Sequence, residues 1–381
     1  MLFKYMKYLL SLVFLSYSFA GLAQIKERII LIGDAGEINA SQQALIAHAA
    51  QQVQKEHTHV FYLGDNIYPD GMPLHGEAEI RDAQAILKSQ YEPMLAQGAW
   101  VYFIAGNHDW NYSQKDGLAR MLAQSDFLNQ QQNPKLNYLP KGGCPDPVAV
   151  ELSDNSVVIA YDSEWFLYRY TRNQVDDSCD CKTPMEVFTK LDELLYTYKD
   201  KFVILAGHHP MYSYSVHGGY YTLRDHLFPL TNINSKLYIP LPVVGSLYPL
   251  FRNTVFLNAE DKAHPSYTYL YETISKLTAN HPNLIFASGH DHGVQYIKKD
   301  KATQIVSGGA SKSNSIYTGK DLLFGYAKGG YAVVDVFADG EREVKFYTFK
   351  DGEVALAYSD RVPFQIPTET VLEADVQNQD S

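Results

Sequence analysis

Residues 60–68 read VFYLGDNIY and join an apolar run to a group of polar side chains. The run at residues 60–63 is short and contains β-branched and aromatic residues, which is typical of a strand buried on both faces. Gly64 and Asp65 follow it directly, and Tyr68 comes three positions later. Since glycine lets the backbone turn sharply, this stretch predicts a loop that presents Asp65 at the end of a strand.

Four other segments repeat this arrangement, in which a glycine is followed at once by side chains that can bind a metal. One such segment alone is usually a turn or a helix cap, but five together indicate a shared site. The carboxyl ends of strands in an open α/β sheet lie at one edge, so the groups that follow them converge in one crevice. The segments are Gly33-Asp34, Gly106-Asn107-His108-Asp109, Gly207-His208-His209 and Gly289-His290-Asp291-His292.

The rest of the pattern predicts strands that alternate with helices. A helix at residues 183–198 begins with a capping box, Thr183 with Glu186, and has Pro184 in its first turn. Residues 331–349 predict a hairpin, and the whole pattern predicts an α/β fold with a mixed sheet. Further helices are predicted at residues 41–56, 77–92 and 267–279, and further strands at residues 28–32, 100–104, 157–161, 202–205, 284–287 and 305–307.

The composition is that of a folded protein with a large core. Of the 381 residues, 46% are hydrophobic and 20% are charged, which excludes disordered, collagen-like and coiled-coil chains. The formal net charge of −11 argues against general binding to nucleic acid or to anionic membranes. An anionic substrate therefore needs a local positive centre.

Residues 1–23 predict a secretory signal peptide. Lys4 and Lys7 precede an apolar run at residues 8–20, and Gly21 and Ala23 are small residues of the kind found before a cleavage site. An uncleaved membrane anchor is the alternative, but the run is shorter than the roughly 20 residues of a spanning helix. We therefore expect an exported protein, periplasmic or secreted, with no membrane contact after cleavage.

Residues 24–362 predict one domain, because no repeat and no Gly/Ser linker divides them. Within this domain, residues 229–265 contain scattered prolines and aromatic residues without a period, which predicts a long loop insertion. Residues 363–381 are acidic and contain no Lys or Arg, which predicts a disordered tail. We expect a monomer.

The chain contains three cysteines, Cys144, Cys179 and Cys181. In an exported protein, a disulfide from Cys144 to either Cys179 or Cys181 is expected, and the third cysteine is left over. A site for a soft metal at the Cys-Asp-Cys spacing is the alternative.

The five glycine segments together hold four carboxylates, two amides, five histidines and one phenol. This set exceeds the needs of one divalent ion and matches two metals that share a bridging carboxylate. Two ions about 3.5–4 Å apart are an arrangement that cleaves phosphoesters. It needs no nucleophilic serine or cysteine, and the sequence contains no Gly-x-Ser-x-Gly motif.

With these motifs the sequence resembles the calcineurin-like metallophosphoesterase superfamily and, within it, purple acid phosphatases of the small tartrate-resistant type. The order of the motifs carries the resemblance from Gly33 to His292, and the turn at 307–310, SGGA, is similar to one that follows in that family. Two departures are the missing aromatic residue in the first motif and the lack of a counterpart for residues 229–265. The resemblance implies a four-layer α/β/β/α sandwich of mixed sheets, with the active site at the carboxyl ends of the strands.

The resemblance also implies a ligand set, with Asp65 bridging the two ions. The expected centre pairs Fe³⁺ with a divalent ion, Fe²⁺, Zn²⁺ or Mn²⁺, because a phenolate ligand suits trivalent iron. A centre of zinc or manganese, with Tyr68 near it but uncoordinated, is the alternative. The expected ligands are Asp34, Tyr68 and His292 for iron, and Asn107, His208 and His290 for the divalent ion.

Two further histidines, His108 and His217, match catalytic histidines of the family that contact the phosphate or protonate the leaving group. Solvated loop histidines are the alternative for both. Asp109 and Asp291 are expected to orient neighbouring histidines. The tyrosines around His217 are candidates for aromatic walls of the substrate pocket, and they are Tyr212, Tyr214, Tyr220 and Tyr221.

These features predict an exported acid phosphatase that hydrolyses phosphomonoesters by attack of a metal-bound hydroxide. Its expected partner is a phosphorylated small molecule and not a nucleic acid. A phosphodiesterase or nucleotidase with the same dinuclear site is one alternative. A protein on the same scaffold that binds metal or phosphate without turnover is the other.

Overall fold

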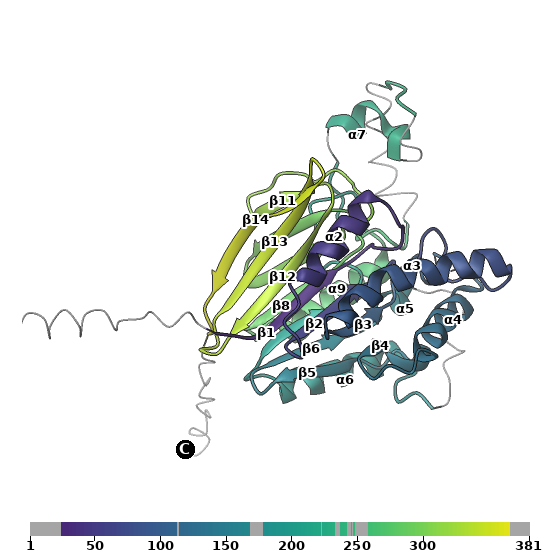
Figure 1. Cartoon of the computed structure of the whole chain (residues 1–381). Helices are drawn as coiled ribbons and strands as arrows, with labels where there is room; N and C mark the ends of the chain where they lie inside the picture. The colour runs from purple at the N-terminus through teal and green to yellow at the C-terminus, as the bar shows by residue number, and fades with distance from the viewer. Residues whose placement is uncertain are drawn as a thin grey trace, which may run out of the picture.

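The computed structural model describes residues 24–365 except 113, 168–177, 222, 233–236, 242–244, 246 and 248–257. These residues form two sheets that pack face to face, with helices on the outer faces (Figure 1). The predicted signal peptide, residues 366–381 of the predicted tail and much of the predicted loop at 229–265 lie outside the described residues.

The first sheet has seven strands and is mixed. Strands β1 to β4 run parallel, and β12, β13 and β14 extend the sheet antiparallel from β1. The carboxyl ends of β1, β2 and β3 therefore lie at one edge. The order is β14 (Glu353–Val362), β13 (Arg342–Lys350), β12 (Gly330–Phe337), β1 (Ile25–Ile32), β2 (Thr58–Leu63), β3 (Trp100–Ile104) and β4 (Leu136–Tyr138).

The second sheet also has seven strands. Its parallel part consists of β6, β7, β8 and β10, while β5, β9 and β11 are antiparallel to their neighbours. The order is β11 (Leu322–Tyr326), β9 (Val294–Lys299), β10 (Ala302–Ser307), β8 (Leu284–Ser288), β7 (Phe202–Ala206), β6 (Ser156–Ala160) and β5 (Val148–Ser153).

The side chains of the central strands alternate between two cores. Ile29 and Leu31 of β1 pack with residues of the second sheet such as Ile204. Ile30 and Ile32 belong to the other core, which contains the apolar faces of the helices. Because successive side chains of a strand point to opposite faces, one strand serves both cores. The α/β/β/α sandwich predicted from the sequence is therefore confirmed.

The helices cover the outer faces of the sheets. Helices α2, α3 and α4 contact strands of the first sheet (Figure 1). Helix α6 begins at the predicted capping box, where Glu186 Oε2 accepts from Thr183 N at 2.9 Å. No helix among the described residues is long and apolar enough to cross a membrane. The helices are α2 (Ala40–Gln51), α3 (Glu77–Ala96), α4 (Gly117–Asn129), α5 (Ser163–Leu167), α6 (Pro184–Thr197), α7 (Leu223–Leu227) and α9 (Pro265–Thr278), with short 3-10 turns η1 (Lys141–Gly143) and η3 (Pro229–Asn232).

Several boundaries differ from the sequence prediction. Helix α2 ends at Gln51 and not at residue 56, while α3 continues through Pro93 to Ala96. The predicted loop ends earlier than expected, because Pro265 is the first residue of α9. Residues 363–365 of the predicted tail are described, and the carbonyls of Pro363 and Gln365 accept from Arg342 and Asn283. The disorder of the tail stays a prediction.

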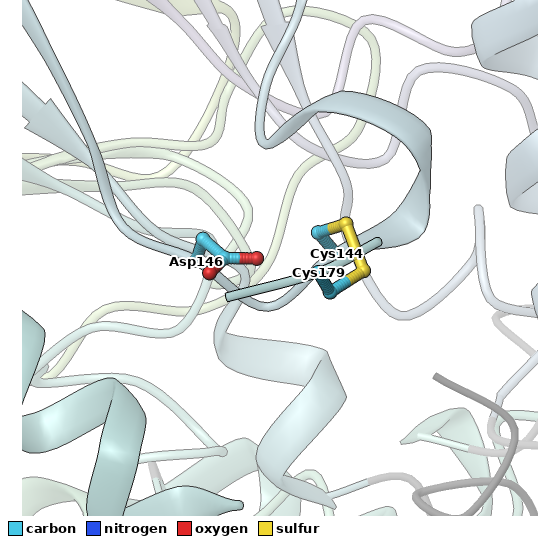
Figure 2. Close-up of side chains that lie close together, drawn as sticks. All are labelled: Cys144, Asp146 and Cys179. Carbon is cyan, nitrogen blue, oxygen red and sulfur yellow. A yellow bond between two sulfur atoms is a disulfide. The ribbon is translucent and has the colours of Figure 1, made fainter. Parts of the chain in front are cut away.

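Cys144 and Cys179 form a disulfide, which Figure 2 shows beside Asp146. Cys181 is free and buried, and its backbone N–H donates to Asp146 Oδ1 at 2.7 Å. A disulfide has no thiolate to offer a metal, so the group in Figure 2 is not a soft-metal site.

Candidate metal centre

The structure brings the seven predicted metal ligands together at the edge where the two sheets meet. Loops after β1, β2 and β3 carry ligands from the first sheet, and loops after β7 and β8 carry ligands from the second. Asp34, Asp65, Tyr68 and Asn107 come from the first sheet, and His208, His290 and His292 come from the second.

The backbone at this edge is strained and tightly packed. Asp34, Asp65 and His290 have φ angles of 58°, 55° and 70°, a left-handed conformation that costs a non-glycine residue on the order of 1–3 kcal/mol. At Gly106 an added Cβ would lie 2.3 Å from Asp65 Oδ1, so only glycine fits there. Strain of this kind is retained where the surroundings fix a functional geometry.

One group of donors surrounds the Tyr68 hydroxyl and is called the Tyr68 group. Tyr68 Oη lies 3.0 Å from Asp34 Oδ1, 3.2 Å from Asp65 Oδ2 and 3.3 Å from His292 Nε2. His292 Nε2 is 3.4 Å from Asp34 Oδ1. Neighbouring ligands at right angles around an ion bound at about 2.1 Å are separated by about 3 Å, so these spacings fit a shared ion.

A second group of donors surrounds the side-chain oxygen of Asn107 and is called the Asn107 group. Asn107 Oδ1 lies 2.9 Å from His208 Nε2 and 3.2 Å from His290 Nδ1. Asp65 Oδ1 lies 3.4 Å from His208 Nε2. Asp65 thus has one oxygen in each group, which is the arrangement of a bridging carboxylate.

The other nitrogens of these two histidines donate to backbone carbonyls. His208 Nδ1 donates to Leu63 O at 2.7 Å, and His290 Nε2 donates to Glu260 O at 3.0 Å. In the neutral rings, His208 Nε2 and His290 Nδ1 therefore carry lone pairs, and both are directed at the Asn107 oxygen. Acceptors that face one another without a proton repel, and a cation between them removes the repulsion.

Burial keeps the histidines in this neutral form. It lowers the pKa of His208 to about 4 and that of His292 to about 3. Burial and the neighbouring Asp65 carboxylate raise the pKa of Asp34 well above its ordinary value. Asp34 and Asp65 are 0% and 1% exposed, and among the described residues neither forms an ion pair with Lys or Arg. The donor set therefore fits metal cations, which would supply the missing positive charge.

The Tyr68 phenol leads to the first prediction. Burial and the Asp34 and Asp65 carboxylates raise the pKa of Tyr68 well above its ordinary value, so the metal-free protein holds the phenol proton. A coordinating phenolate must release that proton. Loading with soluble ferric chelate and zinc at pH 6 should therefore release about one proton more from the wild type than from Tyr68→Phe.

The proton count is measured by calorimetry in two buffers that differ in ionisation enthalpy. The ligand histidines are neutral at pH 6 and release no proton in either protein. The Tyr68 hydroxyl lowers the pKa of Asp34, so Asp34 releases no more protons in the wild type than in Tyr68→Phe, and an excess from the wild type comes from the phenol. Equal proton release from the two proteins would mean that Tyr68 stays uncoordinated.

A pocket of about 310 Å³ opens over the centre. The two predicted catalytic histidines, His108 and His217, line it together with ligands from both groups. The His108 backbone N–H donates to Asp65 Oδ1 at 3.0 Å, and its Nε2 is 3.7 Å from Asp65 Oδ2. Both histidines thus lie where they can contact a molecule bound at the centre. The remaining lining residues are Tyr112, Val216, Thr231, Asn258, Glu260 and Asn314.

Several of these residues were missed by sequence reasoning. Tyr112 donates its hydroxyl to His108 Nε2 at 3.0 Å, and its ring packs against the His108 ring. Its position four residues after His108 was the available signal. Glu260 and Asn258 lie within the predicted loop, near its end, and no motif marks them.

Three expectations about the surroundings of the ligands are wrong. Asp109 does not orient a histidine, because its carboxylate accepts from Asn66 Nδ2 at 3.1 Å and from Gly106 N at 2.8 Å and so joins two loops. The carboxylate of Asp291 is buried and has no hydrogen-bond partner among the described residues. None of the four tyrosines around His217 is among the described residues that line the pocket. Their ring contacts are Tyr214 with Tyr220, Tyr220 with Tyr317, Tyr212 with Tyr271, and Tyr221 with His226.

Two mixed sheets between helices, with candidate metal ligands where the sheets meet, are the arrangement expected of a metallophosphoesterase. The chain matches the family model for calcineurin-like phosphoesterases over residues 27–294, so it belongs to this family, as its motifs predicted. The family uses a metal centre, and its members are phosphoesterases.

Solved structures with a similar fold include two that cover most of this chain. One is GAP50, the anchor in the inner membrane complex of Plasmodium, with 18% identity, a TM-score of 0.56 and 90% of each chain covered. The other is the purple acid phosphatase PPD1 from seeds of yellow lupin (Lupinus luteus), with 12% identity, a TM-score of 0.52, and 90% of this chain and 54% of that chain covered. At these identities the similarity shows the fold alone. No curated protein sequence matches the chain.

Proposed function

We propose that the protein is an exported acid phosphatase that hydrolyses phosphomonoesters at a dinuclear metal centre. The observation that carries this proposal is Asp65, whose two oxygens lie in separate groups of converging acceptors. The Tyr68 group would hold Fe³⁺, and the Asn107 group would hold Fe²⁺, Zn²⁺ or Mn²⁺. When bound, the two ions would supply an activated water and the positive charge that a phosphate needs.

The ligand histidines support activity in acid. Because the pKa of His208 is about 4 and that of His292 is about 3, protons do not compete for these nitrogens until the pH falls to about that range. The centre can therefore stay assembled at mildly acidic pH.

The residues of the pocket would hold the substrate and handle its proton. Both ring nitrogens of His108 have partners, since Nδ1 donates to Pro69 O and Nε2 accepts from Tyr112, so His108 can donate to a substrate only after Nε2 gains a proton. His217 borders the pocket beside His290, with ring centroids 4.1 Å apart. We assign both histidines to binding the phosphate and to donating a proton to the departing oxygen.

The polarity of the pocket favours a leaving group without further negative charge. Its described lining includes no lysine or arginine, and the carboxyl group of Glu260 in the wall has a pKa that burial raises to about 7. A diphosphate or triphosphate would bring extra negative charge that no lysine or arginine of this lining offsets. The lack of a cationic side chain in the described lining therefore favours a phosphomonoesterase over a nucleotidase.

A substrate panel tests this distinction. The value of kcat/KM should be at least about tenfold higher for an aryl monoester or glycerol phosphate than for a nucleoside diphosphate or an aryl diester. Because burial raises the pKa of Glu260 to about 7, its charge is present only near and above that pH, and Glu260→Gln should lower the ratio of monoester to diphosphate rates above about pH 7 and leave it unchanged in acid. A wild-type preference for the diphosphate or the diester would overturn the monoester assignment.

Export is supported by the disulfide between Cys144 and Cys179, since such bonds persist in oxidising compartments. The predicted signal peptide agrees with this location. Detection of the mature chain in a periplasmic or culture fraction, with its amino terminus at Gln24, is the corresponding test.

Turnover needs its own experiment, because a protein of the same fold is described as an anchor. The proposal is tested by metal analysis of the purified protein and by measuring rates of phosphoester hydrolysis across pH 4–9. This range of about five pH units includes the region in which histidines titrate. The expected result is two ions per chain, acid activity and a visible tyrosinate-to-iron band. Two bound ions without hydrolysis of any phosphoester would favour a binding protein instead.

A further inference from the structure

The end of the predicted insertion is built into the wall of the pocket. Asp261 N donates to Asn258 O at 3.0 Å, and His264 N donates to Asp261 O at 2.8 Å, so residues 258–264 form a compact turn. Lys262 ties this turn to the loop after β7. Its backbone N–H donates to His217 O at 3.0 Å, and its Nζ donates to Met211 O at 2.6 Å.

This turn places a buried carboxylate against His217. Asp261 is 1% exposed, and its Oδ1 accepts from His217 Nδ1 at 2.8 Å. On its other side the His217 ring packs against the His290 ring, with an interplanar angle of 44°. The ring is thus fixed by a carboxylate at one edge and by a metal-ligand candidate across its face.

We infer that Asp261 is a positioning residue that orients His217 for the substrate. This inference rests on the proposed function. The carboxylate requires a proton on Nδ1, and a ring held through Nδ1 presents its opposite edge, which carries Nε2, away from Asp261. The insertion, which has no counterpart in the family motifs, therefore supplies part of the substrate-handling apparatus.

A double-mutant cycle tests the inference. Asp261→Ala and His217→Ala should each lower kcat/KM for an aryl phosphate by about 10-fold to 100-fold. Because Asp261 acts through His217, adding Asp261→Ala to His217→Ala should cause no further loss. Asp261→Asn, whose side-chain oxygen can still accept from Nδ1, should recover part of the activity.

Asp321→Ala is the matched control. Asp321 Oδ2 accepts from the hydroxyl of Tyr214, which lies in the same loop as His217, but Asp321 does not line the pocket. We expect wild-type kinetics from this variant. Additive losses for Asp261→Ala and His217→Ala would overturn the inference, because they would show that Asp261 acts elsewhere in the structure.

A second readout does not depend on turnover. Nitrogen-15 NMR of histidine-labelled, zinc-loaded protein should show His217 with its proton on Nδ1, and Asp261→Ala should shift the ring toward a mixture of tautomers. An unchanged His217 signal in Asp261→Ala would overturn the inference. If the tautomer shifts as expected but the wild type hydrolyses no phosphomonoester, the positioning contact stands and the proposed function fails.

Discussion

Replacement of Asp65 by asparagine should lower phosphomonoester hydrolysis by about a thousandfold or more, which corresponds to about 4 kcal/mol of transition-state stabilisation. The reason is the position of its carboxylate, with Oδ2 in the Tyr68 group and Oδ1 in the Asn107 group. An amide keeps the shape and one acceptor but cannot bridge two cations with two charged oxygens. We expect metal analysis to show the loss of at least one of the two ions.

The control for this experiment is Asp70→Asn in the same loop. In the described part of the chain, the Asp70 side chain forms no hydrogen bond or ion pair with the seven candidate ligands, so both ions and the activity should remain. Asp65→Asn with two bound ions and wild-type kcat would contradict the bridging assignment. Circular dichroism of both variants shows whether the fold is intact.

The second large effect concerns stability. Asp335→Asn should lower the free energy of unfolding by about 3–5 kcal/mol, because it leaves buried cations without their partner. Asp335 is 0% exposed and accepts from Arg28 Nε at 2.6 Å, from Arg28 Nη2 at 2.8 Å and from Lys345 Nζ at 2.8 Å. These contacts join β1, β12 and β13. Urea unfolding of the two proteins measures the difference.

Glu343→Gln is the matched variant for this comparison. Its carboxylate also contacts Lys345, at 2.9 Å, but its side chain is 21% exposed. A partly solvated ion pair contributes about 0–1 kcal/mol, so this variant should stay close to the wild type. If both substitutions lower the free energy of unfolding by the same amount, the bidentate contact between Asp335 and Arg28 does not stabilise the fold as argued.

The central strands could be predicted because both of their faces are buried. Residues 60–63 of β2 and the whole of β3 are continuous apolar runs, and every predicted strand is present. The outer strands carry no such signal. Along β14 half-buried and exposed residues mix, and β4 has three residues. Helix α4 was missed although Asp116 is a residue type favoured at the N-cap, since residue 119 is alanine and no capping box marks the start of the helix.

The candidate site could be predicted as far as each ligand follows a glycine near the end of a strand. That local pattern includes Asp65 and Asn107, as well as the histidines after β7 and β8. Asp261 has no local signal. Its contact with His217 spans 44 positions, across an insertion without periodicity. Tyr112 contacts His108 through a turn in which both Asn111 and Tyr112 have positive φ angles. The residue types of this turn do not predict that backbone conformation.

The centre lies where the two sheets meet, and its donors come from both halves of the chain. Ions bound there would cross-link the halves without a covalent bond. By mass action, tight binding to the folded state alone adds about 4 kcal/mol of stability at a free ion concentration a thousand times the Kd. Depletion of the ions by a chelator would then loosen the whole sandwich as well as stop the reaction, so that metal supply in the compartment governs how long the protein persists.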